Sequence, residues 1–129
     1  DAPRMRSTWQ RIRERLEIRP GLLRRYYGSL TAGEGAFGIC SFWAVEYLAL
    51  GGGSIAEAQD QFAALLEYAN DVGLYGEEID PETGAALGNF PQAYTHVGLI
   101  NAAISLRDRL ERGKHDAERA RLHVPEAHP

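Results

Sequence analysis

The chain contains 129 residues, of which 44% are hydrophobic, and it carries a formal net charge of −4. This length fits one domain or one piece of a larger domain, because single domains commonly have about 100–150 residues. Cys40 is the only cysteine, which excludes a disulfide scaffold and a metal site built from cysteines alone. The sequence holds no apolar run near the roughly 18 residues that cross a bilayer, and it starts without a signal-peptide core. We therefore expect a cytoplasmic protein without a membrane partner.

Charge is distributed unevenly along the chain. Residues 1–25 contain eight arginines and three acids, whereas residues 26–106 contain ten acids and no lysine or arginine. The acidic stretch argues against nucleic acid as a partner, because phosphate binding requires a basic face. The N-terminal arginines alternate with apolar residues at helical spacing, so we interpret them as the solvated face of a helix; RNA binding is the alternative.

Two helices are predicted in the first half of the chain. The first, near residues 4–19, has an apolar stripe formed by Met5, Trp9, Ile12 and Leu16. The second, near residues 36–50, is apolar almost all round, has Glu46 as its one charge, and ends at three consecutive glycines. A helix of that composition is buried on most sides, so we expect Trp43 in the core.

Two more helices are predicted further along. Ser54 and Glu57 form a capping-box pattern, which predicts a helix over residues 54–70. Residues 71–88 have no periodicity, and a turn is predicted where Asp, Pro and Gly cluster at 80–84. A last helix is predicted near residues 90–111, with Asn89 as its N-cap. Its expected core stripe is formed by Ala93, Val97, Ile100 and Ile104.

These helices, without an alternating strand pattern, indicate an all-α fold. Nearly all-apolar helices alternate with amphipathic ones, whereas the helices of an independent four-helix bundle have similar character. The alternation suits a two-layer α/α toroid, in which inner helices are covered and outer helices face water. We expect the helices at 36–50 and 90–111 to be the more buried pair in an intact barrel.

Five loop motifs carry a resemblance to a known family. In chain order they are Gly33-Glu34-Gly35-Ala36-Phe37, Cys40-Ser41-Phe42-Trp43, Ala69-Asn70-Asp71-Val72-Gly73-Leu74, Glu77-Glu78-Ile79-Asp80-Pro81 and Leu87-Gly88-Asn89-Phe90-Pro91-Gln92-Ala93 through Ile100. They resemble the C-terminal part of the catalytic domain of glycoside hydrolase family 15, which contains glucoamylases and bacterial trehalases. The resemblance covers residues 1–112 and leaves 113–129 as a polar C-terminal tail. It implies a segment of an (α/α)6 toroid and an inverting mechanism run by two glutamates.

The resemblance implies a catalytic role for Glu77. Inverting hydrolysis needs a protonated carboxyl to supply the leaving oxygen with a proton, and an ionised carboxylate about 6.5–9.5 Å away to activate water. In the family the general base is the first acid of the motif that here reads Gly76-Glu77-Glu78, which is Glu77. No residue of this chain matches the family's general acid. Without the resemblance, Glu77 and Glu78 would be interpreted as two solvated loop acids.

Candidate substrate-binding residues are Glu34, Phe37 and Tyr94. A carboxylate accepts hydrogen bonds from sugar hydroxyls and an aromatic ring covers sugar C–H faces; the alternative for the first two is a capped turn with Phe37 in the core. His96 is interpreted as a structural histidine. The tail histidines, His115, His123 and His128, lack the spacing of a zinc site and are expected in a mobile terminus. We expect no metal and no cofactor.

The predicted helices are too few for a complete toroid, which needs twelve. We therefore expect the missing N-terminal part of the barrel, or a second copy of the chain, as a partner. The predicted function is that of the base-bearing segment of an inverting hydrolase of α-glucosides. Trehalose is favoured over maltooligosaccharides because the Gly-Asn-Phe-Pro-Gln turn at 88–92 resembles the bacterial trehalase-like members. The alternative is a non-catalytic helical interaction module without the general acid.

Overall fold

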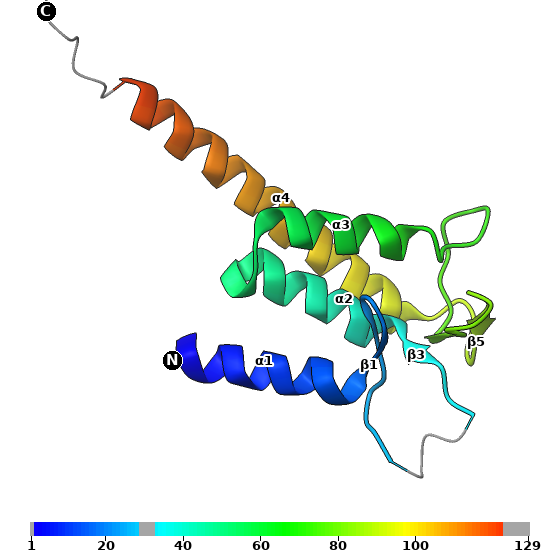
Figure 1. Ribbon diagram of the computed structural model, residues 1–129. Coiled ribbons are helices and arrows are strands. Elements are labelled where there is room, and N and C mark those ends of the chain that lie inside the picture. The colour runs from blue at the N-terminus through cyan, green and yellow to red at the C-terminus, as the bar shows by residue number, and fades with distance from the viewer. Residues whose placement is uncertain (1, 29–32, 123–129) are drawn as a thin grey trace, which may run out of the picture.

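Helices make up most of the computed structural model, which describes residues 2–28 and 33–122 (Figure 1). They are α1 (Ala2–Leu16), α2 (Gly38–Tyr47), α3 (Ile55–Leu66) and α4 (Ala93–Leu122), and α2 continues into a π-helix at Leu48–Gly52. The mostly helical class predicted from the sequence is confirmed. No helix within the described ranges is both long and apolar enough to cross a membrane.

Short strands, which the sequence did not predict, join the helices. Strands β1 (Glu17–Arg19) and β2 (Leu22–Leu23) form an antiparallel hairpin directly after α1. A second sheet has the antiparallel order β3-β4-β5, formed by Ala36–Phe37, Glu78–Ile79 and Ala86–Leu87. Strands of two or three residues are too short to show alternation of polar and apolar residues, which explains why pattern analysis missed them.

The strands shift two predicted helix boundaries. The first helix ends at Leu16 rather than near residue 19, because the chain turns into β1. The second helix begins at Gly38 rather than at residue 36, because the two preceding residues pair with β4. The predicted start of the next helix at Ser54 is confirmed, and the Ser54 hydroxyl accepts a hydrogen bond from the backbone N–H of Glu57 at 3.0 Å. This helix ends at Leu66, four residues before the predicted end at residue 70.

Helices α2 and α4 approach each other closely through small residues. A Cβ atom added at Gly38 would lie 2.5 Å from Cγ2 of Thr95, and one added at Gly98 would lie 3.2 Å from Cβ of Phe42. The first distance is too short for any side chain at Gly38, and the second leaves little room for one at Gly98. The small side chains therefore set the spacing between these helices, and α3 packs against both (Figure 1).

Aromatic side chains fill the centre of the core. The ring of Phe42 packs edge-on against Tyr75, with centroids 5.5 Å apart, and against Phe62 at 6.2 Å. The hydroxyl of Tyr75 donates to the carbonyl oxygen of Leu65 at 3.1 Å. Tyr75 thereby joins the segment that precedes β4 to the end of α3.

The predicted core stripe of the last helix is wrong for this chain. The apolar side chains expected inside are exposed: Val97 is 51%, Ile100 55% and Ile104 44% accessible. The buried residues of α4 are Thr95, Gly98, Ala102 and Leu106. Because the helix is apolar on several sides, periodicity does not choose its buried face, and the smaller residues permit the close contact with α2.

Two further predictions are wrong: the burial of Trp43, and the end of the last helix near residue 111. Trp43 is 53% exposed, because it lies at a groove between α1 and α2 that is also lined by Met5 and Trp9. Helix α4 continues past Gly113 to Leu122, so residues 113–122 are an exposed helical extension, and Figure 1 shows this end projecting away from the other helices. His115 lies on that extension; His123 and His128 lie outside the described residues.

Candidate active site

The main chain of Glu77 is held on both sides by hydrogen bonds. Glu77 directly precedes β4, and its N–H donates to the carbonyl oxygen of Asn89 at 2.9 Å. Its carbonyl oxygen accepts from the N–H of Gly38, the first residue of α2, at 3.0 Å. Glu77 is therefore fixed between the start of α2 and the loop that leads into α4.

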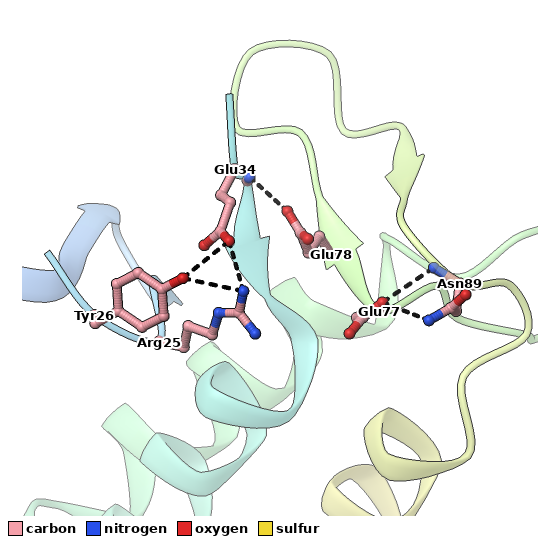
Figure 2. A network of polar contacts seen from close by, with 7 residues as sticks. Arg25, Tyr26, Glu34, Glu77, Glu78 and Asn89 are labelled. Carbon is pink, nitrogen blue, oxygen red and sulfur yellow. Dashed lines mark hydrogen bonds and ion pairs between the residues drawn. The ribbon is translucent and has the colours of Figure 1, made fainter. Parts of the chain in front are cut away.

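The carboxylate of Glu77 is bound by one residue through two donors. Its Oε2 accepts from the backbone N–H of Asn89 at 3.1 Å and from the Nδ2 of the same side chain at 3.0 Å (Figure 2). Neither bond involves Oε1. Both hydrogen bonds to this carboxylate that involve Asn89 therefore converge on Oε2.

The carboxylate of Glu78 points to a different part of the structure. Its Oε2 accepts from the backbone N–H of Gly35 at 2.7 Å, and Figure 2 shows it directed away from Asn89. Successive residues at the start of a strand point to opposite sides, which separates the two acids. Glu78 therefore anchors the segment before β3, whereas Glu77 faces the loop before α4.

Glu34 is part of a charged and aromatic cluster. Its Oε1 accepts from Nη2 of Arg25 at 2.6 Å and from the hydroxyl of Tyr26 at 3.2 Å (Figure 2). The hydrogen bond from Arg25 holds the pKa of the Glu34 carboxyl below its usual range. Glu34 is therefore ionised at neutral pH, and Gly35 links it to Glu78.

Phe37 lies beneath the same arginine. Its side chain is only 6% exposed, and the guanidinium carbon of Arg25 lies 4.4 Å from the ring centroid. The same guanidinium lies 4.8 Å from the ring of Tyr26. This arrangement agrees with the alternative in which Phe37 is a core residue.

The sequence analysis did not name Arg25 among the candidate site residues, although it binds the candidate Glu34. It was interpreted as part of a solvated helix face, but α1 ends at Leu16 and Arg25 follows β2. An arginine directly followed by two tyrosines, outside any apolar stripe, is the signal that distinguishes it from the helical arginines. In the structure its charge is neutralised by Glu34.

The remaining candidates lie near the start of α4. Tyr94 is 70% exposed, and nothing in the described contacts connects it with Glu77. His96 is held by the chain itself: Nδ1 lies 2.8 Å from the carbonyl oxygen of Gln92, and Nε2 accepts from the N–H of Tyr75 at 3.4 Å. These contacts support the structural interpretation of His96.

Asn89 has a different role from the predicted one. It was expected to cap the last helix, but α4 begins at Ala93 and the Asn89 amide binds Glu77 instead. Sequence analysis did not identify this contact, because the two residues are twelve positions apart in a segment without periodicity.

As for metals, residues 2–28 and 33–122 contain no group of three or more His, Cys, Asp or Glu side chains placed to hold an ion.

Comparison with known proteins identifies the family. Residues 53–104 match the family model of glycosyl hydrolases family 15. The chain is 41% identical over 130 residues to a trehalase of Mycolicibacterium smegmatis, which covers 97% of this chain and 19% of that protein. It is 43% identical over 109 residues to a trehalase of Mycobacterium tuberculosis, covering 81% of this chain and 16% of that protein.

A trehalase of Thermoplasma acidophilum is 40% identical over 104 residues, which covers 79% of this chain and 18% of that protein. No solved structure matches the chain significantly. The chain thus belongs to the glycosyl hydrolases family 15 as a partial segment. It spans less than a fifth of the length of these curated relatives. Its helical structure is consistent with a piece of the (α/α)6 toroid of that family.

Proposed function

We propose that this chain is the base-bearing segment of an inverting glycoside hydrolase that acts on trehalose, with Glu77 as the general base. The observation that carries the proposal is the fixed Glu77 carboxylate, whose Oε2 is held by both donors of Asn89. A general base needs an ionised carboxylate with one oxygen available for the proton of the attacking water. The trehalase names of the relatives support the substrate.

The general acid of this mechanism comes from outside the segment. Inverting hydrolysis requires two carboxyl groups on opposite faces of the sugar ring, about 6.5–9.5 Å apart. Glu78 does not serve as the second group, because it is directed toward Gly35 and away from the side that Glu77 faces. Most of the length of the relatives lies beyond this segment, and we assign the acid to that part.

Glu34 is the substrate-binding candidate with the best chemical support. Its carboxylate is ionised and positioned by Arg25, so it accepts hydrogen bonds from sugar hydroxyls without further cost of ordering the side chain. Phe37 and Tyr94 complete the proposed set. Phe37 contributes mainly by holding Arg25 in place, whereas the exposed ring of Tyr94 is accessible for stacking on a sugar.

The test compares the two adjacent glutamates in the intact protein that carries this segment. We expect Glu77→Gln to lower kcat for trehalose about 10²–10⁴-fold with little change in KM, because the amide retains size but takes no proton from water. Glu78→Gln is the matched control and is expected to cost much less. Thermal unfolding of both variants verifies that each retains the fold.

Each other outcome contradicts a specific part of the proposal. Loss of activity in Glu78→Gln with normal turnover in Glu77→Gln would show that the assignment is wrong by one residue. Normal turnover in both variants would place the base elsewhere. A folded wild-type protein that releases no glucose from trehalose would contradict the proposed substrate, and no turnover of maltose either would favour the non-catalytic helical module.

A further inference from the structure

We propose that Asn89 is a positioning residue for Glu77, and that its side-chain amide fixes which carboxylate oxygen takes the proton from water. The inference rests on the proposed function of Glu77 as general base. It assigns the proton-accepting role to Oε1, because both donors of Asn89 bind Oε2. Asn89 itself does not contact the reacting atoms in this proposal.

The geometry restricts rotation of the carboxylate. A backbone N–H and a side-chain N–H of one residue converge on a single oxygen, at 3.1 and 3.0 Å. The main chains of the two residues are also joined, since the N–H of Glu77 donates to the carbonyl oxygen of Asn89 at 2.9 Å. Rotation of the carboxylate about its last bond would break two hydrogen bonds to a charged group at once.

Gly88 allows the carboxylate to lie this close to the loop. A Cβ atom at that position would lie 2.9 Å from Oε2 and 3.1 Å from the Cβ of Glu77. The backbone of Gly88 also has a φ of 70°, which L-residues with side chains rarely adopt. The loop is therefore shaped to bring Asn89 against Glu77.

The side chain of Asn89 is tested apart from its backbone. Alanine at position 89 keeps the backbone N–H, so Asn89→Ala removes only the Nδ2 donor. Asn89→Asp preserves the shape of the side chain but places a negatively charged acceptor against Oε2, where like charges repel. A purely structural role predicts that kcat falls only in variants that have begun to unfold, whereas a positioning role predicts a lower kcat in variants that remain folded, with aspartate worse than alanine.

The experiment measures kcat and KM for trehalose in the intact protein. We expect Asn89→Ala to lower kcat about 10–100-fold, the effect of losing one hydrogen bond to a charged group, with KM changed less than about twofold. Asn89→Asp is expected to lower kcat further than alanine does. In a Glu77→Gln background, Asn89→Ala is expected to cause no further loss, because a positioning residue has no effect without the group it positions.

Asn70 supplies the matched control. It is another loop asparagine, whose Oδ1 accepts from the N–H of Val72 at 3.1 Å and of Leu74 at 2.8 Å. Because aspartate retains these acceptors, Asn70→Asp is expected to leave kcat at the wild-type value. Its alanine variant is expected to lower the melting temperature without lowering kcat at temperatures well below it.

The inference is overturned if Asn89→Asp is at least as active as Asn89→Ala, or if Asn89→Ala raises KM and leaves kcat unchanged. Further loss of kcat on adding Asn89→Ala to Glu77→Gln also contradicts it. If Glu77→Gln is inactive and Asn89→Ala is fully active, the positioning role of Asn89 is rejected while the proposed role of Glu77 stands. Fully active Glu77→Gln rejects the proposed function on which it rests.

Discussion

Arg109 on α4 donates a hydrogen bond to the carbonyl oxygen of Leu48 at 2.6 Å, and its second terminal nitrogen donates to the carbonyl of Gly53 at 3.0 Å. Both carbonyls lie at the end of the helical segment formed by α2 and the π-helix. The last carbonyl groups of a helix lack partners within it and carry partial negative charge. A cation from a distant part of the sequence therefore caps this end.

Replacement of Arg109 by methionine is expected to destabilise the protein. The variant removes charged donors from half-buried carbonyl groups, which typically costs about 1.5–3 kcal/mol in the free energy of unfolding. Urea denaturation measures the change, and Arg112→Met, at an exposed position of the same helix, is the control. Equal stability of the two variants would show that the Arg109 contacts contribute nothing.

Two glycines with similar backbone conformation separate local strain from contact with Glu77. Gly88 has a φ of 70° and Gly73 a φ of 79°, so alanine at either position is expected to cost about 1–2 kcal/mol of stability. No atom outside the immediate neighbours lies within 4 Å of a Cβ added at Gly73, whereas one at Gly88 meets the Glu77 carboxylate. Only Gly88→Ala is expected to lower kcat, by about 10–100-fold. Equal kcat values in the two variants would contradict the role of this contact.

Asp80 gives the stability of the β4–β5 turn a defined pH dependence. The backbone N–H of Glu82, at 2.8 Å, holds the pKa of the Asp80 carboxyl below its usual range, and Thr83 also contributes. A lowered pKa in the folded state means that this carboxylate stabilises the fold above its unfolded pKa. That contribution is lost as the pH falls through the lowered value.

We therefore expect Asp80→Asn to lower the melting temperature at about pH 7. The difference from the wild type is expected to shrink as the pH falls through the lowered pKa, because the wild-type carboxyl then also becomes neutral. Melting curves over this range measure the difference. Asp60→Asn, an exposed substitution on α3, is the control. A difference that persists unchanged at low pH would show that shape, and not charge, determines the effect.

The isolated 129-residue chain is expected to release no glucose from trehalose or maltose above buffer. It carries the proposed base without a matching general acid, and both carboxyl groups are needed for inverting hydrolysis. A coupled glucose assay on purified chain tests this. Turnover that Glu77→Gln abolishes would place the acid within these residues.

The exposed apolar face of α4 is expected to make the isolated chain associate. Val97 and Ile100 are each more than half exposed. Contact between two such faces removes apolar surface from water, which stabilises the associated state by about 25 cal/mol per Å². Val97→Gln with Ile100→Gln is expected to reduce association, measured by light scattering, whereas Arg112→Gln is not. A monomeric wild-type chain would contradict this expectation.

Elements with strong local signals were predictable from the sequence. The capping pattern at Ser54 located the start of α3, and the glycine and proline cluster located the turn between β4 and β5. The apolar stripe of α1 holds in part: Trp9, Ile12 and Leu16 are partly buried, whereas Met5 is exposed. In each case the information lies within a few neighbouring residues.

The rest depends on contacts between distant residues. Helix α4 is apolar on more than one side, so only the position of α2 decides that Gly98 and Ala102 face inward while Ile100 faces out. The bond between Asn89 and Glu77 requires the pairing of β4 with β5, which no pattern in two-residue strands reveals. The family resemblance pointed to Glu77 but contained no information about what holds its carboxylate.

The bonds on either side of the Glu77 peptide have a consequence for amide hydrogen exchange. Its N–H is bound by Asn89 and its carbonyl by Gly38, so solvent reaches these amides only when the loop separates from α2 or from the segment before α4. The amides of Glu77 and Gly38 should therefore exchange more slowly than that of Val72 in the exposed turn. Slow exchange of both amides would place Glu77 in a rigid part of the structure, with its position set by folding and not by a ligand.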